Sequence, residues 1–111
     1  MKNILINIAK DFSATPGPRN RTEGDFSGEQ FREEVLLPAF EIAIENDRKI
    51  EINLDGAAGY GTSFLEEVFG GLAREKGIEE VLHRIEIISE EEPYLREDIE
   101  AYIKDAQKEF S

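Results

Sequence analysis

The glycine-rich segment that ends at Ser63 combines the residue types in this chain that are best suited to chemistry. Asp55 follows an apolar strand pattern, and two hydroxyls, Thr62 and Ser63, open an amphipathic helix pattern. In α/β proteins, anions and regulatory phosphates bind where a strand ends and a helix begins, because the first N–H groups of the helix are unpaired. We therefore predict a docking or anion-binding loop that consists of Asp55, Gly56, Gly59, Tyr60 and Gly61.

The glycine spacing of this loop does not match the known phosphate-binding loops. A P-loop requires GxxxxGK[ST], and no lysine precedes Thr62. A dinucleotide fingerprint requires GxGxxG, whereas Gly56–Gly61 has the spacing GxxGxG. His83 is the only histidine, and it lies far from Thr62 and Ser63 in the sequence. We therefore expect a protein that is not an enzyme, with no catalytic residue, no cofactor and no metal site.

The two hydroxyls have two interpretations. Ser63 and Glu66 have the S-x-x-E spacing of a capping box, which gives Ser63 a structural role. Alternatively, Thr62 or Ser63 accepts a phosphate, which the helix N-terminus would stabilise. Such a phosphate would add about −1.5 to −2 charges to a docking surface. This second interpretation predicts a regulatory, protein-interaction module that is switched by phosphorylation.

The alternative function is that of a small-anion or nucleotide-binding domain. Arg19 and Arg21 lie beside the turn signal Pro16–Pro18, in a segment with a local excess of basic residues. Guanidinium groups bind phosphate through paired hydrogen bonds, so either arginine could fold over the glycine-rich loop and hold an anion. This alternative predicts that Arg19 or Arg21 converges on residues 55–63.

Composition and charge exclude several partners and compartments. The formal net charge is −12, whereas nucleic acids and anionic membranes require a concentrated basic surface, so we expect neither as a partner. The chain has no cysteine, which excludes disulfides and thiolate metal sites. The first apolar run is too short for a signal peptide, and no stretch approaches the ~20 apolar residues of a membrane span. We expect a cytoplasmic protein, whose oligomeric state the sequence leaves open.

Strand and helix patterns alternate along the chain, which predicts one α/β domain over residues 1–111 with a mostly parallel or mixed sheet. We expect about four strands and about three helices in the order β-β-α-β-α-β-α. The expected strands are residues 3–9, 19–22, 49–54 and 84–89. The expected helices begin at the N-cap Ser27, with a bend at Pro38, and cover 63–76 and 93–110, with a short helical turn at 78–83.

Several stretches resemble a small bacterial family described as STAS-like, for which no function is established. The resemblance covers roughly residues 6–75, and its most specific part is GYGTSFLEEVFGG within residues 54–74. STAS domains form anti-sigma-factor antagonists, in which Asp-Ser-Ser-Gly-Leu stands at the start of a helix and a partner kinase phosphorylates the first serine. Thr62 takes the phosphoacceptor place here, with Gly61 in place of the aspartate and Phe64 in place of the glycine. The resemblance implies a non-enzymatic module with a protein partner, an ATPase or kinase-like regulator.

Overall fold

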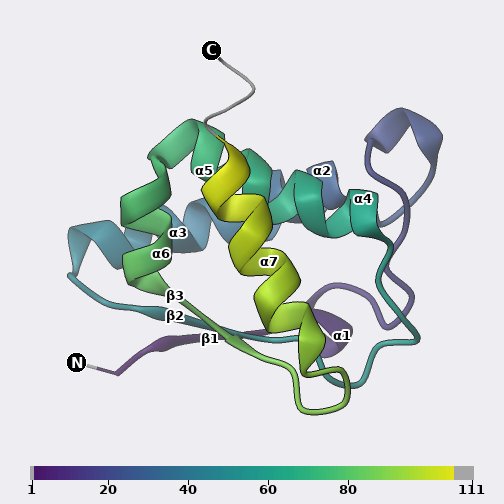
Figure 1. The fold of residues 1–111 in the computed structure, drawn as a ribbon, viewed down its shortest axis with the longest axis horizontal. Coiled ribbons are helices and arrows are strands. Elements are labelled where there is room, and N and C mark those ends of the chain that lie inside the picture. The colour runs from purple at the N-terminus through teal and green to yellow at the C-terminus, as the bar shows by residue number, and fades with distance from the viewer. Residues whose placement is uncertain (1, 107–111) are drawn as a thin grey trace.

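The computed structural model describes residues 2–106, which form a parallel sheet covered by helices (Figure 1). The strands of the described chain are β1 (Ile4–Asn7), β2 (Ile50–Asn53) and β3 (Ile85–Ile88), in the order β1-β2-β3. Both pairings are parallel, and the register places Ile6, Ile52 and Ile87 side by side. Parallel neighbours require crossover connections, and helical segments provide them here.

The helical segments follow the strands in the alternating order that the sequence predicts. Their bounds are α1 (Ile8–Asp11), η1 (Arg21–Glu23, a 3-10 turn), α2 (Gly28–Phe31), η2 (Arg32–Leu36, a π turn), α3 (Leu37–Glu45), α4 (Thr62–Leu65), η3 (Glu66–Gly70, a π turn), α5 (Gly71–Lys76), α6 (Ile78–Arg84) and α7 (Tyr94–Asp105). Two long helical stretches, residues 28–45 and 62–76, are therefore each interrupted by a π turn.

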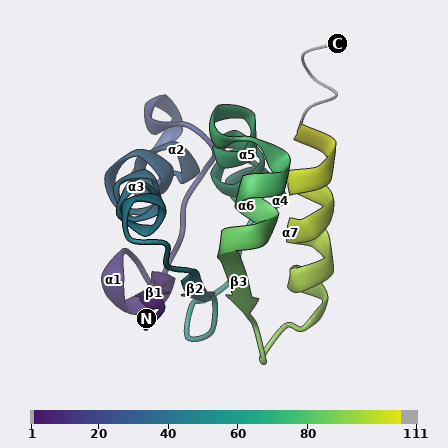
Figure 2. The same cartoon turned by 90° about the vertical axis from the view of Figure 1, so that its left-hand side faces the viewer.

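The helices from α2 to α7 lie on one face of the sheet, as the two perpendicular views show (Figures 1 and 2). On the helix-facing side, Ile6, Ile50 and Ile52 are buried. On the opposite face, Leu5 is 69% exposed and Glu86 is exposed. Side chains alternate between the two faces of a strand, so every second residue of each strand reaches the same core.

The two π turns lie where the sequence disturbs regular helix geometry. Pro38 has no N–H and cannot make an α-helical hydrogen bond, and η2 ends two residues before it. The helix geometry therefore changes from π to α just before Pro38, where the sequence predicts a bend. In the second stretch, η3 ends at Gly70, the first of two adjacent glycines, which are poor helix formers.

The expected second strand is wrong. Residues 19–22 do not pair with the sheet; Arg21–Glu23 form η1, in which the Asn20 N–H donates to the Glu23 carboxylate at 3.0 Å. The Gly17 N–H donates to the Phe26 carbonyl at 2.9 Å, which closes residues 17–26 into a loop. These local hydrogen bonds satisfy backbone groups that would otherwise pair in a strand. The described sheet therefore has three strands, all parallel, and no hairpin at its start.

The other elements lie close to their expected positions. Ser27 is buried and its hydroxyl accepts from the Gln30 N–H at 3.0 Å, which confirms the predicted helix start. The expected strand at residues 3–9 is shorter, because Ile8–Asp11 turn into α1. The helical turn expected at 78–83 is the complete helix α6. The final helix is described as far as Asp105, and residues 107–110 of its predicted extent lie outside the described chain.

Candidate functional site

The glycine-rich loop connects β2 to α4 at the carboxyl end of the sheet and is tied down at several points. The Tyr60 hydroxyl donates to the Leu54 carbonyl at 2.7 Å, which joins the two ends of the loop. The Ala58 N–H donates to the Ala14 carbonyl at 2.8 Å, which fixes the loop to the segment after α1. Gly56 has a φ of 93°, a conformation that side-chain-bearing residues rarely adopt. The loop therefore presents an exposed backbone in a fixed shape.

Asp55 joins this loop to the loop that follows β3. Its carboxylate accepts hydrogen bonds from the N–H groups of Glu90 at 3.2 Å and Glu91 at 3.0 Å. In return, the Glu91 carboxylate accepts from the Gly56 N–H at 2.8 Å. The aspartate thus forms a bond between two loops that are 35 residues apart in sequence. Two carboxylates give this end of the loop a negative charge.

Tyr60 connects the loop to the hydrophobic core. Its ring lies 6.0 Å from the Phe64 ring, centroid to centroid. Burial, and then the nearby Asp55 carboxylate, raise the pKa of the Tyr60 hydroxyl well above its ordinary value. The hydroxyl therefore stays protonated at neutral pH and acts as the hydrogen-bond donor to Leu54.

Thr62 and Ser63 are exposed at the start of the helix that follows the loop. The predicted capping box is wrong: the helix starts one residue earlier than expected, its N-cap is Gly61, and no side chain caps it. Glu66 cannot complete the box because its carboxylate binds Arg74 at 2.7 Å. Within residues 2–106, neither hydroxyl makes a hydrogen bond, so both are accessible groups with no structural partner.

The two arginines of the basic segment bind carboxylates. Arg19 donates to Glu66 at 2.6 Å and to Glu67 at 3.3 Å, so it lies beside the helix that begins at Thr62. Arg21 donates to Glu33 at 3.1 Å and forms an ion pair with Glu34 at 3.0 Å. In the described chain neither arginine has a hydrogen bond or ion pair to residues 55–63: Arg19 binds η3, and Arg21 binds the neighbouring helical stretch.

A chain of ion pairs that the sequence analysis missed links the two π turns. Glu67 binds Arg32 at 2.8 Å, and their side chains are only 15% and 14% exposed. The charges alternate along this chain, which consists of Arg74, Glu66, Arg19, Glu67, Arg32 and Glu75. Burial alone would raise the pKa of Glu66, but the hydrogen bonds from Arg74 and Arg19 outweigh it and lower that pKa below its ordinary value.

The adjacent glycines Gly70 and Gly71 make room for these ion pairs. A Cβ added at Gly71 would lie 2.8 Å from the Arg32 Nε, and one at Gly70 would lie 2.4 Å from a Glu66 carboxylate oxygen. Two adjacent glycines inside a helix are costly, and close approach of a neighbouring element is the usual reason for them. The structure identifies that approach as the side chain of Arg32. The glycine pair was thus the available sequence signal for the ion-pair chain.

The remaining chemistry-bearing groups do not form a site in the described chain. His83 is exposed on α6, away from the glycine-rich loop in sequence. Among residues 2–106, no three histidine or carboxylate side chains are grouped so that they could hold a metal ion. Within the same range, no helix has both the length and the apolar character needed to cross a membrane.

Comparison with known protein families gives a match over most of the helices and two of the strands. The model of the family described as "STAS-like domain of unknown function (DUF4325)" matches residues 27–95, more than half of the chain. The matched range begins at the N-cap of α2 and ends in the first turn of α7, so it includes β2, β3 and the glycine-rich loop. Neither the curated proteins nor the solved structures contain a significant match.

Proposed function

The chain belongs to the STAS-like family of unknown function, and on this basis we propose that it is a non-enzymatic regulatory module that binds a partner protein. The proposed docking surface consists of the glycine-rich loop, residues 55–61, and the helix start at Thr62 and Ser63. The partner is an ATPase or kinase-like regulator, as the resemblance to STAS antagonists implies.

The observation that carries this proposal is the pair of exposed hydroxyls of Thr62 and Ser63, which have no hydrogen bond within the described chain and lie beside a loop of fixed shape. A surface that is already ordered loses little conformational entropy when it binds, which favours docking. Hydroxyls without a structural partner are also accessible to a kinase. The hydrogen bonds of Tyr60, Ala58 and Asp55 supply the order, and the helix start supplies the hydroxyls.

Phosphorylation of either hydroxyl would switch this surface through charge. Glu66 and Glu67 follow Thr62 and Ser63 by four residues, so they lie on the same helix face as the added phosphate. The phosphate would gain from the helix N-terminus but would add about −1.5 to −2 charges on the helix face that carries these carboxylates. Arginines already pair with both carboxylates, so the phosphate would make the local charge more negative, which would repel an acidic partner surface.

The anion-binding alternative has less support. Arg19 and Arg21 are both bound to glutamates, and an incoming anion would have to displace these carboxylates. The loop itself has Asp55 and Glu91 at its first turn, which disfavour an anion there. A thermal-shift screen of nucleotides and phosphate at millimolar concentration tests the alternative directly, and stabilisation by any of them would favour it over protein docking.

The proposed function is tested by affinity capture from the native host with mass spectrometry. The baits are the wild-type chain, Thr62→Glu, Ser63→Asp, and the control Thr22→Glu, which places the same charge on an exposed threonine of η1. We expect a protein that the wild type and Thr22→Glu retain and that both charged variants at the helix start lose. Phosphate on residue 62 or 63 of the native protein would support the switch. Equal retention by all four baits would contradict it.

A further inference from the structure

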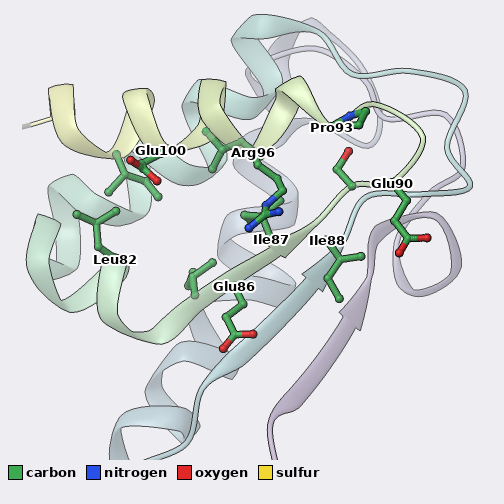
Figure 3. Close-up of a pocket in the computed structure, with 12 residues that line it drawn as sticks. Leu82, Glu86, Ile87, Ile88, Glu90, Pro93, Arg96 and Glu100 are labelled. Atoms are coloured by element: carbon green, nitrogen blue, oxygen red, sulfur yellow. The ribbon is translucent and has the colours of Figure 1, made fainter.

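A groove of ≈ 790 Å³ runs between strand β3 and helix α7 (Figure 3). One end of it reaches Glu90, whose N–H donates to Asp55 of the proposed docking loop. The strand side of the groove includes Ile87 and Ile88, and the helix side includes Ile99 and Ile103. Leu82, which is 37% exposed, lies at one end, and Arg96 reaches from α7 toward the strand in Figure 3. The groove therefore has an apolar floor and runs along a sheet edge.

The outer edge of β3 has backbone groups without partners. The Ile88 carbonyl accepts from the Leu54 N–H at 2.8 Å, so the backbone groups of residue 88 point toward β2. Backbone groups alternate along a strand, and those of Ile87 therefore point outward. Among the described residues, no strand pairs with this side of β3 and no hydrogen bond involves the Ile87 N–H or carbonyl. A sheet edge of this kind is a template for an additional strand.

The two faces of an added strand would lie beside different kinds of side chain. Ile85 and Ile87 lie on the helix-facing side of the sheet, where the groove is lined by Ile99 and Ile103. Glu86 lies on the opposite face. The groove lining as a whole contains three carboxylates, those of Glu86, Glu90 and Glu100, and one guanidinium, that of Arg96.

We propose that the outer edge of β3 binds an extended segment of a partner protein as a fourth strand, and that this segment alternates apolar and basic residues. The apolar residues enter the groove under α7, and the basic residues lie beside Glu86 on the uncovered face. Main-chain hydrogen bonds provide the affinity and the alternating side chains provide the specificity in this mode of recognition. A second copy of this chain is a poor occupant, because it would bring Glu86 and Glu90 of two acidic chains together.

The first experiment measures binding of a defined probe, a fluorescein-labelled heptapeptide of alternating lysine and valine with lysine at both ends. Its control has the same composition with the valines placed together, so that charge is constant and alternation is lost. We expect the full chain to bind the alternating peptide about ten-fold more tightly than the control by fluorescence anisotropy, with affinity that falls as salt rises. Equal affinity for the two peptides would overturn the proposal.

The second experiment locates the binding by variants. Ile87→Pro removes an outward N–H without removing a bond to β2, and an edge position is where a strand tolerates proline. Glu86→Lys combined with Glu90→Lys reverses the charge of the groove rim, and Glu45→Lys combined with Glu79→Lys makes the same charge change at exposed sites elsewhere. We expect the first two proteins to lose about ten-fold in affinity and the last to keep most of it.

Amide hydrogen exchange keeps the proposal falsifiable even if Ile87→Pro does not fold. In the wild type, the alternating peptide should slow exchange of the Ile87 N–H, which has no partner in the described chain. Protection confined to the helix start at Thr62 would overturn the proposal and support only the docking loop. A dimer of the wild type without peptide, lost in the Glu86→Lys and Glu90→Lys protein by sedimentation, would instead assign the edge to a second copy. Because the two surfaces use different residues, the failure of one leaves the other intact.

Discussion

Asp55 and Glu91 exchange hydrogen bonds across the carboxyl end of the sheet: the Asp55 carboxylate accepts from the Glu91 N–H at 3.0 Å, and the Glu91 carboxylate accepts from the N–H of Gly56 at 2.8 Å. Each side chain thus binds the backbone of the other's loop. This reciprocal pair holds the loop of the proposed docking surface against the loop that leads into α7.

Removing either side of this pair should loosen the docking loop. We expect Asp55→Asn and Glu91→Gln each to lower the free energy of unfolding by about 1–2 kcal/mol, because each weakens a charge-assisted hydrogen bond. The two changes should be non-additive by about 0.5–1 kcal/mol, since they act on the same contact between loops. Urea denaturation of the two single variants and the double variant measures this. Glu90→Gln is the control, and a similar loss there would show that charge alone is responsible.

Gly28 is a glycine whose replacement should be costly. A Cβ there would lie 2.8 Å from the Phe64 carbonyl oxygen, a backbone atom that cannot move without shifting α4 against α2. We expect Gly28→Ala to lower the free energy of unfolding by about 1–3 kcal/mol, as overpacked cores do. Gly59→Ala is the matched control, because nothing lies within 4 Å of the added carbon. A thermal melt that shows equal effects at both positions would contradict the close approach of these helices.

The Glu66 ion pairs predict a dependence of stability on acid pH. The folded state holds the pKa of Glu66 below 4.5, so the folded protein binds fewer protons than the unfolded chain. This contribution is complete above pH 4.5 and is lost as the pH falls through the pKa of the folded state. We expect Glu66→Gln to be less stable than the wild type by about 1–3 kcal/mol at pH 7. Urea denaturation at pH 3 should show a smaller difference in the free energy of unfolding between the two proteins. If this difference is the same at both pH values, the ion pairs are not its cause.

Tyr60 predicts a second dependence at alkaline pH. Its pKa is raised above the ordinary value of 10.0, so the folded state keeps a proton that the unfolded chain releases. The stabilising contribution is present below pH 10.0 and is lost as the pH rises through the raised pKa. Tyr60→Phe should be less stable by about 1 kcal/mol at pH 8, where the hydrogen bond to Leu54 is lost. By pH 11 the difference in stability between the wild type and Tyr60→Phe should shrink or change sign. An equal difference at pH 8 and pH 11 would show that the pKa of the Tyr60 hydroxyl is not raised.

The local sequence was sufficient to predict most of the strands and helices. Ile50, Ile52 and Leu54 occupy every second position, as apolar residues do in a strand, and Ser27 has a side chain that can cap a helix. In both cases the residues that form the pattern also stabilise the element. The glycine-rich loop was located for the same reason, since a glycine cluster between a strand and a helix produces a tight turn. The helix after it was found through its apolar stripe, although its first turn begins at Thr62 rather than Ser63.

The partners of the charged side chains could not be predicted, because they come from distant parts of the chain. Arg19 has Glu66 as a partner and Asp55 has the Glu91 backbone, and no local pattern indicates either pair. The expected strand at residues 19–22 failed for a related reason: strand propensity there was weaker than the turn formed by Asn20 and Glu23.

The sequence by itself determined an α/β chain with a parallel sheet and a loop at the start of a hydroxyl-bearing helix, because strand, cap and turn preferences act over a few residues. Only the tertiary structure decided which carboxylates bind Arg19 and Arg21 and that Gly71 makes room for Arg32. It also decided that no strand within residues 2–106 lies beside the outer edge of β3. These are contacts between segments far apart in sequence, and they depend on how the helices pack on the sheet rather than on any local preference.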